Sequence, residues 1–337
     1  MGDTFARKRL MGLVSGGVLA QCCYAVAELG VPDLLAGDGA ARPVAELAAE
    51  CGADPVALDR LLGDLAHFGV FRHCGDDGYA LTSVGELLRT DVPGSLRQTA
   101  IMHGEEVARS FVAITHTLRT GRPAFDEVHG RPFYDYLTEH PDVGDTMAEA
   151  MGAVGVPPVL AGYEPLERAS TVVDIGGGDG GLLAAVLTAR PALRAVLLEL
   201  PGAIRAARSR LADAGLLDRA ELVAGSFFDD VPAGGDVYVL ARVLHNWADE
   251  HAVTILRRVR QAMKDQARLI VLERFRSAAG GSVTTAMVDL LMLGLLDGRQ
   301  RTEAEYVALL TAAGFTVAAV APPAGEPGDR LIEARPR

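Results

Sequence analysis

The sequence predicts an α/β protein in which a mostly parallel sheet domain follows a mainly helical winged-helix domain. From residue 171 onward, apolar strand-like runs alternate with segments of helical spacing, which is typical of a parallel sheet covered on both faces. A glycine-rich turn follows the first of these runs, and the first hundred residues are rich in amphipathic stretches. The chain, at 337 residues, exceeds one typical domain. We expect a winged-helix domain at 1–100, connecting helices at 101–165 and the sheet domain at 166–337.

Amphipathic stretches around 17–29, 43–51 and 55–68 predict helices in the first part, and residues 70–82 enclose a CGDDG turn between two strand-like pieces. Asp54 is suited to cap the third of these helices. Together these features form a winged-helix pattern. Such a domain can read DNA, but the helix that would enter the groove is acidic and mostly apolar. We therefore expect this domain to form a protein interface.

Residues 84–165 are predicted to form further helices joined by a loop at 120–132, where glycine and proline interrupt the helical pattern. Seven apolar runs then predict strands, at 171–175, 194–200, 220–226, 236–243, 267–275, 315–322 and 329–334. Helical spacing fills most of the gaps between them. This part of the chain therefore predicts the parallel sheet.

The composition is that of a soluble, globular protein. Hydrophobic residues make up 49% of the chain and charged residues 23%, and no apolar run approaches the roughly 20 residues that a membrane span needs. The N-terminus has basic residues but no convincing cleavage site, so we expect a cytoplasmic protein without a transmembrane helix. The net charge of −12 opposes binding to phosphate backbones, and nucleic acid is not an expected partner.

Four cysteines lie in the first quarter of the chain, at Cys22, Cys23, Cys51 and Cys74. They have no CxxC spacing, and no histidine pattern of a zinc site accompanies them. We expect buried, reduced thiols and no bound metal.

The turn DIGGGDGG, from Asp174 to Gly181, leads from an apolar run into a helix-like stretch at 182–189. Glycine lets a ligand approach the backbone, and a helix N-terminus offers free N–H groups with a partial positive charge. Glu199 ends the next apolar run, 21 residues beyond Gly178, where an acid can reach a ribose hydroxyl. These features predict a nucleotide-like cofactor. The loop fits both the dinucleotide fingerprint and the methyltransferase pattern, so it leaves NAD and S-adenosylmethionine open.

His245 and Trp247 follow directly on the strand-like run at 237–244. Ligand sites in open α/β sheets lie at such carboxyl ends of strands. A histidine is the usual group for taking a proton at neutral pH, and Glu273, at the end of the next run, is placed to hold its other ring nitrogen. A histidine satisfied by local backbone, with the glutamate on a loop rim, is the alternative that spacing leaves open.

Four further motifs carry a resemblance to a known family. LELP (198–201), GSFF (225–228), LHNW (244–247) and GRQRTEAEY (298–306) occur in this order. With them, essentially the whole chain resembles the S-adenosylmethionine-dependent small-molecule O-methyltransferases, in particular bacterial enzymes of secondary metabolism related to the plant caffeate and flavonoid enzymes. The resemblance implies a Rossmann-like cofactor domain and a winged-helix dimerisation domain. It also implies a homodimer, and S-adenosylmethionine as the cofactor with S-adenosylhomocysteine as its product.

The resemblance also assigns roles to residues. Gly176 and Gly178 would line the methionine end of the cofactor, Glu199 would bind the ribose, and Ser226 and Phe227 would flank the adenine. The full set of expected cofactor-binding residues is Asp174, Gly176, Gly178, Glu199, Leu200, Ser226, Phe227 and Arg242. Asp179 would face the cofactor's amino group or cap the loop.

By the same resemblance, His245 would deprotonate a substrate hydroxyl and Glu273 would orient the histidine. Gln300 stands where plant members have a second acid, and it cannot ionise. This departure leaves open an acidic phenol that needs little help, catalysis mainly by positioning, or a diverged chemistry such as hydroxylation, decarboxylation or pericyclic ring closure. An NAD-dependent oxidoreductase is the remaining alternative, although it would usually place the glycine loop nearer its N-terminus.

The acceptor pocket is expected to be apolar, because a phenol or polyketide is the family's usual acceptor. The expected substrate-binding residues are His103, Phe133, Met147, Met151, Asn246, Trp247, Met287 and Met292, and further wall candidates are Phe111, Phe125, Tyr136 and Leu293.

Overall fold

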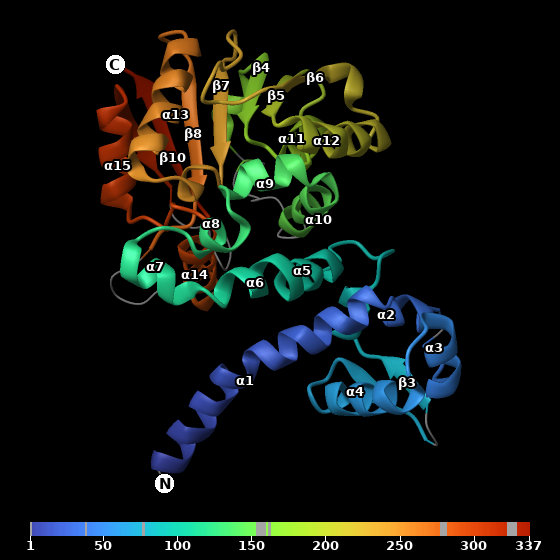
Figure 1. The fold of residues 1–337 in the computed structure, drawn as a ribbon. Helices are drawn as coiled ribbons and strands as arrows, with labels where there is room; N and C mark the ends of the chain where they lie inside the picture. The colour runs from blue at the N-terminus through green and yellow to red at the C-terminus, as the bar shows by residue number, and fades with distance from the viewer. Residues whose placement is uncertain are drawn as a thin grey trace. The chain divides into compact units, whose positions relative to one another are not determined.

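A computed structural model gives the fold of the chain (Figure 1). It describes residues 2–37, 39–75, 78–152, 160, 163–276, 282–321 and 329–337. Residues 76–77 of the expected turn, 153–159 and 161–162 of the expected connecting region, and 322 of an expected strand lie outside this set. The chain divides into two compact units: residues 1–109 with 149–154 form the first, and residues 110–148 with 155–337 form the second. The expected connecting region at 101–165 is thus shared between them.

The first unit contains the expected winged-helix elements. Helices α1 (Gly2–Glu28), α2 (Val31–Leu34), α3 (Val44–Cys51) and α4 (Pro55–His67) accompany a small sheet of order β1-β3-β2, built from β1 (Arg42–Pro43), β2 (Phe71–His73) and β3 (Gly78–Leu81). The Asp54 side chain accepts a hydrogen bond from Ala57 N at 2.8 Å and so caps α4, as the sequence predicts. Leu58, Leu62 and Leu65 of α4 are buried in the core of this unit.

Helix α1 is longer and more apolar than the sequence pattern predicts. Although glycines interrupt its apolar run, the helix is continuous, and Thr4–Glu28 is long and apolar enough to cross a membrane by length and composition. Large apolar side chains are exposed along its first two thirds, at Phe5, Leu10, Met11, Leu13, Val14 and Val18. Such a face needs a cover of some kind.

A continuous helical stretch closes the first unit, running through α5 (Arg97–Met102) and α6 (Ala108–Phe111), of which Ser110 and Phe111 already belong to the second unit. The five residues between them, His103–Val107, form a π-helical turn that is crossed by α1. Tyr24 of α1 donates to Glu105 at 2.8 Å, and Gln21 donates to the carbonyl of Gly104 at 2.9 Å. His103 therefore lies in a bulge that α1 helps to hold.

The middle of the chain corrects one prediction. Helices α7 (Ile114–Thr120), α8 (Ala124–His129), α9 (Phe133–Glu139) and α10 (Pro141–Gly152) follow one another, so the expected loop at 120–132 contains the helix α8. Pro123 precedes α8 and Gly130 ends it in the left-handed conformation. Proline and glycine here mark the two ends of a short helix.

The second unit is built on a seven-stranded sheet of order β6-β5-β4-β7-β8-β10-β9. Its strands are β4 (Thr171–Ile175), β5 (Arg194–Glu199), β6 (Ala220–Ala224), β7 (Val237–Ala241), β8 (Arg268–Glu273), β9 (Phe315–Val320) and β10 (Arg330–Pro336). All neighbours pair in parallel except β10, which is antiparallel to both β8 and β9. Every expected strand is present, and the predicted Rossmann-like class is confirmed. The order reverses beside β4, which is the switch point where such sheets bind ligands.

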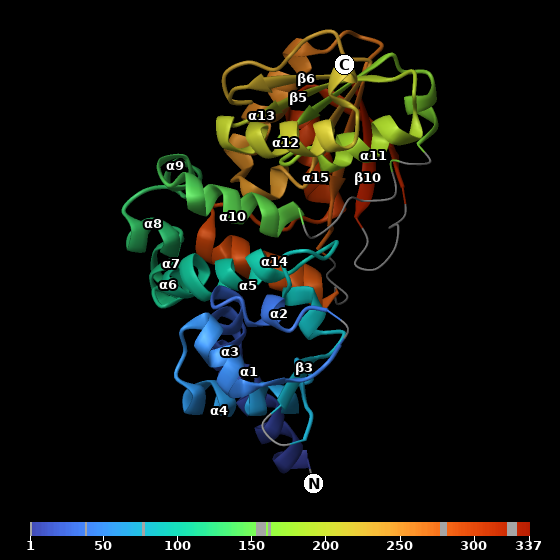
Figure 2. The ribbon, with the colours of Figure 1, turned by 90° about the vertical axis from the view of Figure 1, so that its right-hand side faces the viewer.

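Helices cover both faces of this sheet (Figures 1 and 2). On one face, α11 (Gly181–Ala189) and α12 (Pro201–Asp213) bury Leu183 and Leu211 against strand residues such as Val172. On the other, α13 (Asp249–Ala262) and α15 (Glu303–Ala312) bury their apolar residues against residues such as Val173. Helix α14 (Val283–Leu295) completes the unit and contacts α7 and α8. Because successive strand residues face opposite sides, near-continuous apolar runs supply both cores.

The cysteines differ in part from the prediction. All four are free thiols, but each is partly exposed and none is buried. Among the described residues there is no group of three or more His, Cys, Asp or Glu side chains that could hold a metal ion.

Candidate active site

The glycine loop follows β4 and begins the site. Gly176, Gly178 and Gly180 have φ of 70°, 58° and 73°, a left-handed conformation that favours glycine. Asp179 accepts a hydrogen bond from Gly181 N at 3.0 Å, at the start of α11, and its other oxygen pairs with Arg210. Of the two roles considered for Asp179, the structure shows the loop cap.

Asp174 lies at the end of β4, and its side chain is fully buried. A Cβ on Gly177 would come within 2.2 Å of Asp174 Oδ2, so the loop backbone presses directly on the carboxyl group. Neither oxygen has a hydrogen-bond partner among the described residues. Burial, with the nearby charges of Glu199 and Asp179, raises the pKa of Asp174 to about 7.

Glu199 and Leu200 lie at the end of the neighbouring strand, β5. The carboxylate of Glu199 accepts a hydrogen bond from Leu200 N. Burial raises the pKa of Glu199, while the backbone N–H groups of Leu200 and Gly178 oppose this rise. Since Gly178 is one of these partners, the expected ribose acid faces the glycine loop. Gly225 N also donates to the carbonyl of Glu199 at 2.9 Å, which joins the loop after β6 to this end of β5.

Aromatic side chains gather beside this loop. The Phe227 ring lies 5.8 Å from the Trp247 ring, edge to face, and within 3.4 Å of where a Cβ on Gly176 would be. Ser226 Oγ accepts from Phe228 N at 3.2 Å, so its hydroxyl takes part in a local turn. Tyr134 of α9 stacks on Trp247 at 5.2 Å, with ring planes 17° apart.

Tyr134 was not among the residues predicted from the sequence. Burial raises the pKa of its hydroxyl, and the charge of Glu199 adds to this rise. The sequence candidates beside it, Phe133 and Tyr136, instead contact Phe125 in an internal aromatic cluster. The helical periodicity of α9 determines which of these neighbouring aromatic side chains points to the glycine loop.

His245 and Glu273 meet as predicted. The short turn Leu244–Asn246 follows β7, and His245 is 6% exposed. Its Nδ1 lies 3.1 Å from Oε2 of Glu273, which is fully buried at the end of β8. Oε1 of the same carboxylate accepts from Leu244 N at 2.9 Å and from His245 N at 3.3 Å. Glu273 therefore holds the backbone of the histidine through Oε1. Its Oε2 lies close to the ring but makes no hydrogen bond among the described residues.

Gln300 also approaches Nδ1 of His245, and its Nε2 lies 3.2 Å from this ring nitrogen. When Nδ1 donates its hydrogen to Glu273 it has no lone pair for an amide N–H. A half turn of the amide presents Oε1, which is buried and otherwise without a partner, to the same hydrogen. With the amide turned in this way, Gln300 accepts from Nδ1–H and leaves Nε2 as the basic nitrogen, while Glu273 Oε2 lies 3.1 Å from Nδ1 without a hydrogen bond among the described residues.

Arg242 pairs with an acid of the second unit. It has φ of 57°, in the left-handed region, and its side chain binds Asp329 through Nε at 3.1 Å and Nη2 at 2.5 Å. Arg274 Nε lies 3.6 Å from the same carboxylate. The interaction that the structure shows for Arg242 is thus with the start of β10, and its contact with a cofactor stays a prediction.

The expected acceptor residues are spread over the chain. Phe133 and Met147 are buried, Asn246 is buried and donates to the Arg242 carbonyl at 3.5 Å, and Met292 is half-buried. Met287 is 51% exposed on α14. His103 and Met151 belong to the first unit and the others to the second.

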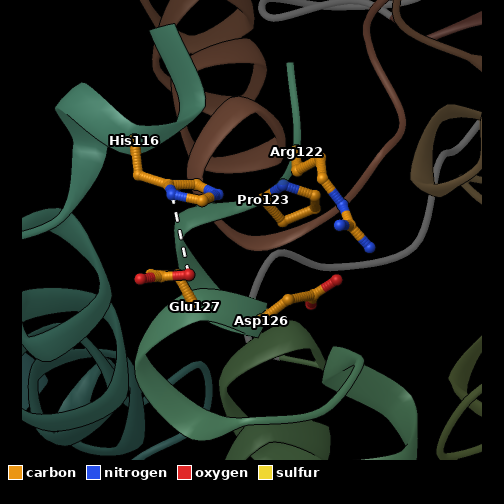
Figure 3. A pocket seen from close by; sticks show the side chains of 5 residues that line it. All are labelled: His116, Arg122, Pro123, Asp126 and Glu127. Carbon is orange, nitrogen blue, oxygen red and sulfur yellow. Dashed lines mark ion pairs between the residues drawn. The ribbon is translucent and has the colours of Figure 1, made fainter. Parts of the chain in front are cut away.

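One pocket lies away from these residues, between α7 and α8. It is lined by His116, Arg122, Pro123, Asp126 and Glu127, with His116 Nδ1 3.6 Å from Glu127 Oε2 (Figure 3). None of the residues predicted from the sequence lines it.

Fold and site together define a class of protein. A glycine loop and an acid at the switch point of a Rossmann-like sheet, next to a buried histidine and carboxylate, define an α/β enzyme that uses a nucleoside cofactor. Comparison with known proteins is more specific. Residues 111–316 match the O-methyltransferase domain and residues 11–91 match the O-methyltransferase dimerisation domain.

Similar proteins span nearly the whole chain. A phenazine O-methyltransferase of Lysobacter antibioticus is 37% identical over 97% of this chain and 95% of its own. An 8-amino-8-demethylriboflavin N,N-dimethyltransferase of Streptomyces davaonensis is 40% identical over 89% of this chain and 87% of its own. An O-methyltransferase from neocarzinostatin biosynthesis, solved with S-adenosylmethionine and 2-hydroxy-5-methyl naphthoic acid, superposes with a TM-score of 0.81, at 35% identity and with 95% and 96% of the two chains covered.

The chain therefore belongs to the S-adenosylmethionine-dependent small-molecule O-methyltransferase family, as its motifs predict. This membership decides between the two cofactors that the glycine loop left open.

Proposed function

We propose that this enzyme transfers the methyl group of S-adenosylmethionine to a hydroxyl of an aromatic or polyketide-type small molecule, with His245 as the general base and Glu273 as its orienting residue. The observation that carries the proposal is the buried pair itself. His245 lies at the carboxyl end of the strand next to the glycine loop, with Nδ1 3.1 Å from Glu273 Oε2. This arrangement supports a base on one side of the acceptor and a cofactor cradle on the other.

The residues present fit the cofactor. Left-handed glycines keep the loop free of side chains, Glu199 faces Gly178, and Asp174 has two buried oxygens without partners. Glu199 would accept hydrogen bonds from the ribose hydroxyls, and Phe227 would supply an apolar face for the adenine. When bound, S-adenosylmethionine supplies an electrophilic methyl group on its sulfonium. Asp174, Gly176, Gly178, Leu200, Ser226 and Arg242 complete the proposed set.

Residues of the chain would then remove the acceptor's proton. A phenol has an ordinary pKa near 10, so its deprotonation at neutral pH costs about 4 kcal/mol. His245 Nε2 would take this proton, because Nδ1 faces Glu273 Oε2 at 3.1 Å and Gln300 at 3.2 Å. The resulting positive charge on the ring would be stabilised by the buried carboxylate. Holding the acceptor oxygen in line with the methyl group contributes on the order of 7–11 kcal/mol more.

An aromatic acceptor suits the side chains near His245. Tyr134 and Trp247 form a stacked pair, and Met292 on α14 is half-buried. A nitrogen acceptor is the second candidate, since a relative 40% identical is named an N,N-dimethyltransferase. An amine loses its proton more readily after methylation than before it. Methyl transfer to an amine therefore depends less on the general base. The dependence of activity on His245 therefore distinguishes the two.

The same proposal includes a homodimer in the cytoplasm. Residues 11–91 match a dimerisation domain, and α1 exposes Leu13 and Val14 at 73% and 70%. Covering these side chains with a second copy would bury the apolar face of α1. The free thiols agree with a reducing compartment. We expect a dimer by light scattering for wild type and for Val112→Glu, which changes an exposed valine outside this domain, and a monomer for Leu13→Glu. A stable, active wild-type monomer would contradict this part.

Transfer of a labelled methyl group to a panel of phenols and aromatic amines tests the activity. We expect transfer to at least one phenol, a fall of 10²- to 10⁴-fold in His245→Ala, and a large fall in Glu273→Ala. His67→Ala, which removes an exposed histidine of the first unit, serves as the control. Wild-type rates in both variants would leave positioning as the mechanism. Absence of any calorimetric binding of S-adenosylmethionine would overturn the cofactor assignment as well.

A further inference from the structure

Arg301 is a fully buried arginine directly behind the turn that carries His245. Its Nη1 donates to the carbonyl of Leu244 at 2.8 Å, and its Nη2 donates to the carbonyl of Trp247 at 2.6 Å. These two carbonyls lie at the two ends of the segment that contains His245. One guanidinium therefore spans the turn.

The turn is held from two directions. Glu273 accepts from the N–H groups of Leu244 and His245, while Arg301 donates to carbonyls of the same turn. Gly298 packs against it as well, because a Cβ there would lie 2.0 Å from the His245 carbonyl oxygen. The backbone of the histidine thus has little freedom to move, and this restricts the position of its side chain as well.

Asp249 balances the charge of Arg301. Its Oδ1 accepts from Arg301 Nε at 2.8 Å and lies 2.7 Å from Nη2. Burial of Asp249 opposes its ionisation, but the hydrogen bonds and charges of Arg301 and Arg299 together outweigh this effect and lower its pKa. Arg299 also reaches Asp249, at 3.2 Å, but it continues to Glu305 and has no contact with the turn among its hydrogen bonds. The chain therefore offers a matched pair of arginines on one carboxylate.

We propose that Arg301 is a positioning residue for methyl transfer, and that Asp249 orients its guanidinium so that His245 Nε2 faces the acceptor. This inference rests on the proposed role of His245. Arg301 contacts neither the acceptor nor the cofactor in this assignment and acts through the backbone of the turn. A lysine could keep the charge opposite Asp249, but it lacks the planar fork that serves two carbonyls and a carboxylate at once.

Steady-state kinetics of Asp249→Asn, Arg301→Lys and Arg299→Gln test the proposal. We expect kcat to fall about tenfold in Asp249→Asn and about a hundredfold in Arg301→Lys, with KM for acceptor and cofactor within twofold of wild type. Arg299→Gln should keep wild-type kcat although it loses a contact with the same carboxylate. Asp249 is partly exposed, so its variant should fold even if Arg301→Lys does not. Equal losses in Asp249→Asn and Arg299→Gln would overturn the proposal.

A double-mutant cycle with His245→Ala separates this proposal from the function on which it rests. If Asp249 acts through the histidine, Asp249→Asn should have no further effect in the His245→Ala background. The same tenfold loss in both backgrounds, or an unchanged kcat in the single variant, would refute the positioning role alone. Wild-type activity in His245→Ala would instead refute the proposed base.

Discussion

Asp174 gives a quantitative prediction, because a buried carboxyl group with no partner opposes folding once it ionises. Its side chain is fully buried, and neither oxygen has a hydrogen bond among the described residues. Asp174→Asn keeps the shape of the group and removes its charge. We expect this variant to be more stable than wild type above neutral pH in the absence of cofactor.

The pKa of Asp174 sets the magnitude and the pH range. A pKa raised from 3.8 to about 7 corresponds to about 4 kcal/mol against the ionised folded state. Because the folded protein holds this proton more tightly than the unfolded chain, stability falls as the pH rises from about 4 to about 7. Between pH 5 and pH 8 the loss is about 3 kcal/mol, and it is absent in the amide variant. The corresponding change in melting temperature is roughly 5–10 °C.

Thermal unfolding of cofactor-free wild type and Asp174→Asn at pH 5, 6, 7 and 8 measures this difference. The melting temperature of Asp174→Asn should rise relative to that of wild type with each increase in pH. Asp265→Asn, at a side chain that is 91% exposed, should show a constant difference. A difference for Asp174→Asn that does not change with pH would refute the reasoning. So would a growing advantage of wild type, since it would mean that the loop stabilises the ionised carboxylate.

Three further predictions follow from local geometry. Gly298→Ala should lower kcat about a hundredfold in steady-state assays while KM stays unchanged, because the new Cβ would displace the His245 carbonyl. A fully active variant would contradict the close packing of Gly298 against His245. Asp54→Ala should lower the free energy of unfolding by about 1 kcal/mol in urea titrations without changing kcat, since it removes one helix cap, and an unchanged midpoint would speak against that cap. Tyr134→Ala should weaken calorimetric binding of S-adenosylmethionine, whereas Tyr134→Phe should retain it because the ring still stacks; equal losses in both would assign the effect to the hydroxyl.

The second unit was predicted most completely, for a physical reason. Each strand of a doubly covered sheet is buried on both faces, so it appears in the sequence as an apolar run. Glycine at Gly176 and Gly178 reflects a backbone conformation that other residues rarely adopt, and this too is local. The neighbouring carboxyl ends of β7 and β8 follow from the alternation of strands and helices. The meeting of His245 and Glu273 could therefore be predicted from their positions at two strand ends.

Other features depend on local choices that the pattern leaves open. Glycine and proline at 120–132 were interpreted as a loop, yet they delimit the short helix α8. The absence of disulfide and zinc-site spacing favoured buried thiols, but all four cysteines are partly exposed. The apolar run of α1 contains several glycines, and its helix is nevertheless continuous.

The sequence by itself determined the fold class, which rests on the periodicity of burial, and the family, which rests on its ordered motifs. It also predicted the glycine loop from local backbone needs, and the approach of His245 to Glu273 from their positions at neighbouring strand ends. Only the tertiary structure decided that Tyr134 reaches Trp247 while Phe133 packs inward. Only the tertiary structure brought Arg301 to the two carbonyls that flank His245, from more than fifty residues away along the chain. The contacts of Arg301 join distant segments through backbone carbonyls, which every residue possesses, and therefore leave no signature in the order of the side chains.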